Sequence, residues 1–134
     1  MRETLSVLFA NLDEATVKTA RRAIQGYSSQ LTSCSSTEAL FETLQNESID
    51  VVLLDFEQPF EISFDLLSEL KAQSPQTEVV FVSRFDDEKL WVEALQRGAY
   101  DFLAKPLELS ELKRVLVQAT ERHHPLKAVR VTAS

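Results

Sequence analysis

Short apolar runs alternate with helical segments along this chain, and that alternation limits its fold more than any other feature. Runs typical of strands cover residues 5–10, 30–34, 49–54, 78–83 and 100–104. Helices are expected over residues 13–25, from 36 onward, and over 64–71, 86–96 and 109–122. Five successive β–α units predict parallel strands joined by right-handed crossovers. The sequence therefore predicts an α/β fold, a doubly wound five-stranded parallel sheet with helices on both faces.

Length and composition fit one small domain. The 134 residues have no apolar stretch near the roughly 18 residues of a membrane span, so we expect no membrane partner. The single cysteine, Cys34, cannot form an internal disulfide, which favours a reducing, cytoplasmic location. A net charge of −7 argues against nucleic-acid binding, because phosphate backbones attract Lys and Arg. We expect the domain over residues 1–122, with 123–134 as a C-terminal tail or the start of a linker.

Chemically distinctive side chains stand where three of the expected strands end. Asp55 follows the third strand, Ser83 ends the fourth, and Lys105 follows the fifth. Taken singly, each has an ordinary explanation as a turn former, a strand end or a solvated lysine. Ligands of open α/β sheets bind outside the carboxyl ends of the strands. Together, an acid, a hydroxyl and an amine at one edge of the sheet therefore indicate a functional site.

Two segments carry a family resemblance. Residues 50–59, with Pro59 four residues after Asp55, are similar to the phosphoacceptor strand of bacterial response-regulator receiver domains. Residues 98–106 resemble the fifth-strand signature of the same family even more closely. Ser83 stands at the family's Ser/Thr position, and Phe102 at its aromatic switch position. The resemblance covers residues 5 to about 120 and implies the flavodoxin-like receiver fold, with strand order 2-1-3-4-5.

The resemblance also implies a signalling function rather than enzymatic turnover. Asp55 would accept a phosphoryl group from a histidine kinase or phosphotransfer protein in a phosphorelay. Lys105 would neutralise the phosphoryl oxygens, Ser83 would donate a hydrogen bond to them, and Phe102 would rotate inward. The response would pass to a downstream protein or a tethered output domain. A homodimer through the face of the fourth helix, fifth strand and fifth helix is a further expectation.

The sequence departs from the family at the magnesium site. Receivers have two adjacent acids after the first strand, where this chain has Asn11 and Leu12. Mg²⁺ prefers oxygen ligands, and leucine offers none. Asp55 and Glu57 remain as ligands for Mg²⁺. Asp13 joins them only if the alignment shifts by one residue.

This departure leaves alternatives open. One is a pseudo-receiver, a protein-interaction module that does not depend on phosphorylation. Another is a flavodoxin-like enzyme that binds a nucleotide or flavin, against which the two glycines, Gly26 and Gly98, argue because neither lies after the first strand. Arg84 stands where the family has a small residue. We hypothesise that it leans toward Asp55 or Glu57 and replaces part of the metal's charge; the alternative is a solvated arginine.

Overall fold

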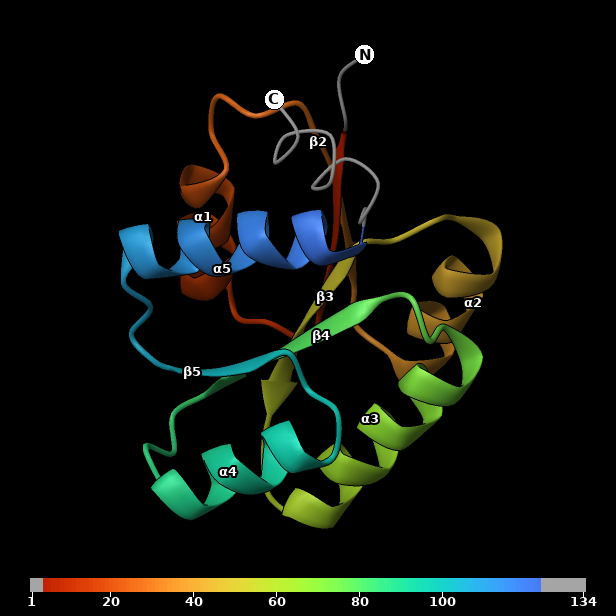
Figure 1. Ribbon diagram of the computed structural model, residues 1–134, viewed down its shortest axis with the longest axis vertical. Helices are drawn as coiled ribbons and strands as arrows, with labels where there is room; N and C mark the ends of the chain where they lie inside the picture. The colour runs from red at the N-terminus through yellow and green to blue at the C-terminus, as the bar shows by residue number, and fades with distance from the viewer. Residues whose placement is uncertain (1–3, 124–134) are drawn as a thin grey trace, which may run out of the picture.

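A computed structural model describes residues 4–123, over which five strands alternate with five helices (Figure 1). The strands are β1 (Leu5–Ala10), β2 (Ser29–Cys34), β3 (Val51–Phe56), β4 (Glu78–Ser83) and β5 (Asp101–Ala104). The helices are α1 (Glu14–Ala23), α2 (Thr37–Asn46), α3 (Phe60–Gln73), α4 (Glu88–Gln96) and α5 (Leu109–His123). Every predicted element is present and in the predicted order.

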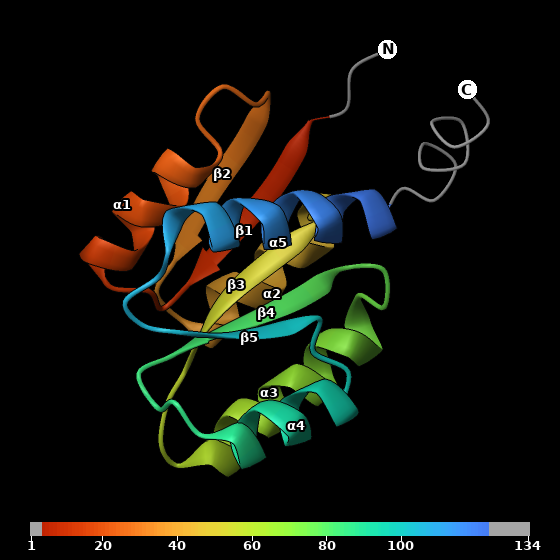
Figure 2. The same ribbon diagram turned by 60° about the vertical axis from the view of Figure 1, so that its left-hand side comes forward.

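The strands form one parallel sheet in the order β2-β1-β3-β4-β5. Helices α1 and α5 cover one face, and α2, α3 and α4 cover the other (Figures 1 and 2). The doubly wound fold and the 2-1-3-4-5 order are thus confirmed. Since β1 and β3 lie in the middle of the sheet, the residues at their carboxyl ends meet at one edge.

Two apolar cores hold the layers together, and side chains of β3 alternate between them. Val51 and Leu53 pack with residues of α1 and α5, whereas Val52 and Leu54 pack with residues of α2, α3 and α4. All four are at most 1% exposed. Full burial of such side chains contributes roughly 1.5–3 kcal/mol each. This two-sided burial explains why β3 is an unbroken apolar run.

Several element boundaries differ from the prediction. Strand β3 begins at Val51 rather than Ile49 and continues through Asp55 to Phe56, because Asp55 and Phe56 still pair with β4. Helix α3 begins at Phe60, not Phe64. The ring of Phe60 stacks on Phe56 at 5.1 Å between centroids, a tertiary contact that the helical periodicity alone does not reveal.

Helix α4 begins at Glu88 rather than Asp86, because Asp87 is its N-cap and accepts a hydrogen bond from Lys89 N. Helix α5 extends to His123. Residues 124–134 lie outside the described part of the chain, so the expected tail or linker stays a prediction. Between residues 4 and 123, no helix is long and apolar enough to cross a membrane.

Candidate functional site

The carboxyl edge of the sheet brings three charged side chains together. The Lys105 ammonium lies 2.9 Å from Asp55 Oδ1 and 3.3 Å from Asp13 Oδ2. The Asp55 side chain is only 6% exposed, Lys105 is 22% exposed and Asp13 is 56% exposed. The ammonium group therefore joins an inner carboxylate to an outer one. Because Asp55 is largely removed from water, Lys105 is its main source of positive charge.

Local structure holds each of these groups in place. Asp55 lies in β3 between β1 and β4. The Lys105 backbone N–H donates to the Ser83 carbonyl at 2.7 Å, which fixes the chain just after β5. Asp13 caps α1 by accepting a hydrogen bond from Thr16 N at 2.8 Å. The site therefore rests on two strands and one helix N-terminus.

The ionisation of the two outer groups follows from these contacts. Burial alone would lower the pKa of Lys105, but its hydrogen bonds and attraction to Asp55 and Asp13 outweigh burial and raise that pKa. Hydrogen bonds from Thr16, together with Lys105, lower the pKa of Asp13. At neutral pH, Lys105 is thus held as a cation and Asp13 as an anion.

Glu57 and Arg84 line the same cavity of about 230 Å³ as these residues. A hydrogen bond with Asp55 and repulsion from its charge raise the pKa of Glu57, while Arg84 and Lys105 act in the opposite direction. The Arg84 guanidinium lies 5.3 Å from the centre of the Phe85 ring. Arg84 thus lies at the site, as the hypothesis requires. Within residues 4–123, however, it has no ion pair of 4.0 Å or less.

The remaining two predicted residues, Ser83 and Phe102, do not line this cavity. Ser83 is fully buried, and its hydroxyl accepts a hydrogen bond from Phe85 N at 2.8 Å and lies 3.3 Å from the Phe85 carbonyl. That hydroxyl is therefore engaged in a local turn. Phe102 is 7% exposed and packs against Phe56 and Phe81, with ring centroids 5.1 and 6.2 Å away. Its ring is therefore buried among the aromatic side chains of the core.

The side chains at this edge do not fit a magnesium ion. Asn11 follows the end of β1 and lines the cavity with Asp55, but it offers a neutral amide, and Leu12 has no donor atom. Asp13 is held by Thr16 and Lys105. Among residues 4–123, no group of three or more His, Cys, Asp or Glu side chains could hold a metal. Of the expected ligands, only the Asp55 carboxylate and Glu57 remain, and the Glu57 carbonyl lies 3.3 Å from the Ser63 hydroxyl.

The contact between Lys105 and Asp13 was not predicted from the sequence. From the sequence, Asp13 was expected to start the first helix and, in a shifted alignment, to act as a metal ligand, not to pair with Lys105. Strands β1 and β5 are separated by β3 and β4 in the sheet, so pairing of neighbouring strands does not bring these residues together. The signal was present in two parts: an acidic N-cap three residues after β1, and a long lysine side chain directly after β5.

The chain is similar in sequence to known bacterial regulators. The chain matches the response regulator receiver domain family over residues 7–117. It is 31% identical to the DNA-binding transcriptional regulator NtrC of Rhizobium meliloti over 85% of this chain and 24% of NtrC. It is also 31% identical to the response regulator protein PilR of Pseudomonas aeruginosa, over 63% of this chain and 19% of PilR. The chain thus spans about a quarter or less of these relatives.

Solved structures share the fold. A response regulator from Thermotoga maritima superimposes with a TM-score of 0.82 at 23% identity, covering 89% of this chain and 99% of that one. NtrX from Brucella abortus gives a TM-score of 0.79 at 22% identity, over 97% of this chain and 29% of NtrX. At this level of identity, the likeness supports the architecture described above.

Proposed function

The chain belongs to the response regulator receiver domain family of two-component signalling, and we propose that it accepts a phosphoryl group on Asp55 from a histidine kinase or phosphotransfer protein. The observation that carries this proposal is the 2.9 Å contact between the Lys105 ammonium and Asp55 Oδ1. The modification would switch a downstream protein or a tethered output domain. The proposal includes a cytoplasmic location and no enzymatic turnover by this domain itself.

The proposed transfer uses the Asp55 carboxylate as a nucleophile. One carboxylate oxygen attacks phosphorus in line, the new oxygen–phosphorus bond forms, and the bond from phosphorus to the donor's imidazole nitrogen breaks. Lys105 neutralises charge on the transferred oxygens, where a donor in a poorly hydrated site acts most strongly. Arg84 lines the same cavity and adds a second positive charge.

Ser83 and Phe102 are the proposed relay. Phosphorylation would give the Ser83 hydroxyl a charged oxygen acceptor, in competition with its present bonds to Phe85. A charge-assisted hydrogen bond is roughly twice as strong as a neutral one, which favours that exchange. Phe102 already packs inward in this structure. The event that responds to phosphorylation would therefore be the release of the Ser83–Phe85 turn, with Phe102 held against Phe56.

Receiver domains typically bind Mg²⁺ at the phosphorylation site. Because this chain has Asn11 and Leu12 where acids are usual, we propose that Lys105 and Arg84 supply much of the positive charge. Asn11 and Leu12 equally favour the alternative of a pseudo-receiver that binds a protein partner without phosphorylation. The two functions differ in one measurable property, the modification of Asp55.

Phosphorylation of the full chain tests the proposal. The protein is incubated with acetyl phosphate, and separately with a histidine kinase and ATP, each with Mg²⁺ and with EDTA. We expect a base-labile phosphoryl group on Asp55, detected by intact-mass spectrometry, and none in Asp55→Asn. Asp65→Asn, on the exposed side of α3, is the matched control and should be modified like the wild type. An unmodified wild-type protein under all four conditions would support the pseudo-receiver.

A further inference from the structure

The two carboxylate oxygens of Asp13 are bound by different groups. Oδ1 accepts a hydrogen bond from Thr16 N at 2.8 Å, which caps α1, and Oδ2 lies 3.3 Å from the Lys105 ammonium. Helix α1 is itself anchored, because Thr16, Ala20 and Ala23 are buried. The cap therefore fixes the orientation of the carboxylate, although more than half of the Asp13 side chain is exposed. Unlike most exposed ion pairs, this one has a partner that is already held in place.

Lys105 needs such a partner, because its side chain is long and flexible. Its backbone N–H is held by the Ser83 carbonyl at 2.7 Å, but that bond does not direct the ammonium. The ammonium lies 2.9 Å from Asp55 Oδ1 and 3.3 Å from Asp13 Oδ2, and it has no other ion pair of 4.0 Å or less within residues 4–123. Asp55 alone would leave the ammonium free to turn about one contact, whereas Asp13 adds a second fixed point.

The exposure of the three side chains gives the direction in which Asp13 acts. Asp55 is nearly buried, Lys105 is partly exposed and Asp13 is mostly exposed. All three line the cavity of about 230 Å³, so Asp13 holds the ammonium on the outer side of Asp55. A phosphoryl donor that approaches from solvent meets the ammonium there. The ammonium is thus held where the oxygens of the incoming group arrive.

The charge of Asp13 has the opposite effect on donor binding. The cavity is lined by three carboxyl groups, those of Asp13, Asp55 and Glu57, and by two cations, Lys105 and Arg84. A phosphoryl donor is an anion, and a further carboxylate repels it. Asp13 therefore cannot help this site by attracting the donor. Any benefit comes through the placement of Lys105, and the two effects can be measured separately.

We propose that Asp13 is a positioning residue, which holds the Lys105 ammonium in place for the phosphoryl oxygens during transfer to Asp55. It acts through Lys105 and does not touch the phosphoryl group. Solvent screens the ion pair, so its effect is on the orientation of one side chain rather than on the stability of the fold. This inference rests on the proposed phosphorylation of Asp55, which uses the same ammonium.

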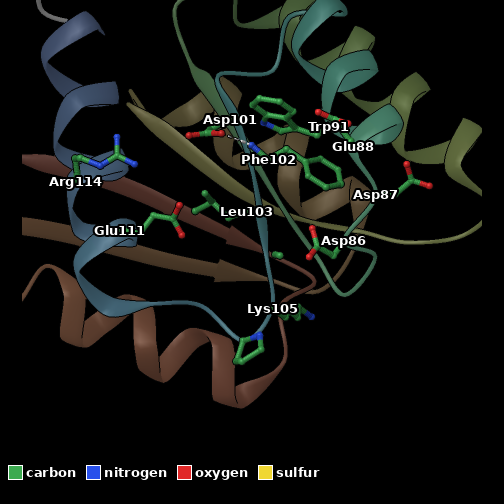
Figure 3. Close-up of a pocket in the computed structure, with 12 residues that line it drawn as sticks. Asp86, Asp87, Glu88, Trp91, Asp101, Phe102, Leu103, Lys105, Glu111 and Arg114 are labelled. Carbon is green, nitrogen blue, oxygen red and sulfur yellow. Dashed lines mark hydrogen bonds between the residues drawn. The ribbon is translucent and has the colours of Figure 1, made fainter.

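A substitution at Asp13 can remove its charge and keep the cap. Asparagine caps helices about as well as aspartate, so Asp13→Asn should fold like the wild type. Asp87→Asn is the matched control, because Asp87 caps α4 by accepting a hydrogen bond from Lys89 N at 2.8 Å. Figure 3 shows Asp87 at the start of α4, apart from Lys105. The two variants make the same change at a helix N-cap, and only the first removes a partner of Lys105.

The mobility of Lys105 tests the positioning directly and needs no phosphorylation. In the unphosphorylated full chain, the NMR order parameter of the Lys105 ε-carbon is measured, and Lys105→Met identifies its signal. We expect Asp13→Asn to lower this order parameter, because one of two ion pairs is lost, and Asp87→Asn to leave it unchanged. An order parameter that is the same in Asp13→Asn and in the wild type would overturn the proposal.

The rate of phosphorylation tests the consequence. The initial rate of Asp55 modification is measured by intact-mass spectrometry against the concentration of acetyl phosphate, with Mg²⁺ present. We expect Asp13→Asn to lower the maximal rate about ten-fold, within the loss that a misplaced group causes, without raising the half-saturating concentration. Asp87→Asn should match the wild type.

Two outcomes of the rate measurement would contradict the proposal in different ways. A maximal rate in Asp13→Asn that equals or exceeds that of the wild type would show that Asp13 does not aid the transfer. A wild type that is not modified would overturn the proposed function and this role with it. The order parameter would then still show whether Asp13 orders the Lys105 ammonium, so the two failures are distinguishable.

Discussion

Replacing Lys105 by methionine removes the ammonium from beside Asp55 while keeping most of the side chain's length and apolar stem. In the structure that ammonium lies 2.9 Å from Asp55 Oδ1, and the Asp55 side chain is 6% exposed. Water therefore has little access to the carboxylate and cannot fully replace the lost partner. We expect Lys105→Met to destabilise the fold, and Asp55→Asn in the same background to remove much of that loss.

The coupling between the two residues can be estimated from their environment. A hydrogen bond to a charged group contributes about 1.5–3 kcal/mol. Breaking a fully buried ion pair costs about 3–5 kcal/mol, but Lys105 is 22% exposed, so the lower range applies. Asp13 lies 3.3 Å from the Lys105 ammonium, but its side chain is 56% exposed. Solvent screens this second ion pair, so it adds little to the stability of the fold. We expect a coupling free energy of about 2 kcal/mol for Asp55 and Lys105.

A double-mutant cycle measures this coupling. Wild type, Lys105→Met, Asp55→Asn and the double variant are unfolded in urea, and the free energies of unfolding are compared. Glu93 and Arg97 on α4 give a matched exposed pair, 2.7 Å apart with side chains 43% and 45% exposed. Their coupling should be about 0.3–0.5 kcal/mol and should weaken in salt. A coupling for Asp55 and Lys105 no larger than that of the exposed pair would refute the reasoning.

Two further predictions concern the acids and amides around Asp55. Glu57→Gln should stabilise the protein near pH 7, by less than about 1 kcal/mol because the side chain is exposed. Asp55 raises the pKa of Glu57 in the folded state, so the ionised carboxylate opposes folding above that pKa. The gain should disappear as pH falls through this pKa, and thermal melts across that range check it. Asn11→Asp places a second carboxylate beside Asp55. At a Mg²⁺ concentration of roughly ten times Kd, the free energy of unfolding of Asn11→Asp should rise by about 1.4 kcal/mol. Mg²⁺ should raise the free energy of unfolding less in the wild type and in Asn46→Asp, on α2.

The strand positions were predictable because burial on both faces leaves an unbroken apolar run. The same reasoning placed Asp55 and Lys105 at one edge of the sheet, and the 2.9 Å contact agrees with that expectation. The predicted start of α3 was wrong because it was taken from the first residue of the apolar stripe. The helix begins earlier, directly after Pro59, where the ring of Phe60 stacks on Phe56. Tertiary packing there overrides the local pattern.

Side-chain bonding at the site was harder to predict. Ser83 ends β4 as expected, but its hydroxyl is bonded to the backbone of Phe85, two residues later. Local hydrogen bonds of this kind compete with any distant acceptor, and residue types alone do not show which one prevails. The pairing of Lys105 with Asp13 depends on the reach of one long side chain across the sheet edge. Neither contact has a periodic signal in the sequence.

Phe56 connects the end of β3, where Asp55 lies, with the aromatic rings of α3, β4 and β5. It follows Asp55 in β3, and its ring contacts Phe60, Phe64, Phe81 and Phe102 at 4.9–5.2 Å between centroids. Protein cores are close-packed, so one of these rings cannot move without moving its neighbours. Phe102 also lines a hollow between α4, β5 and α5 (Figure 3). A single side chain thus belongs both to the aromatic cluster and to the lining of that hollow.

The aromatic cluster also reaches the other end of the site. Phe60 packs edge-on against Phe85 at 5.2 Å, and Phe85 carries both the backbone groups that bond Ser83 and the ring beneath Arg84. Replacing acids by Asn11 and Leu12 changes how charge is balanced at Asp55, but it leaves these ring contacts in place. The residues that stand in place of the acidic pair and the rings that link β3 to β5 are therefore different residues, so the loss of the acids leaves the packing between β3 and β5 intact.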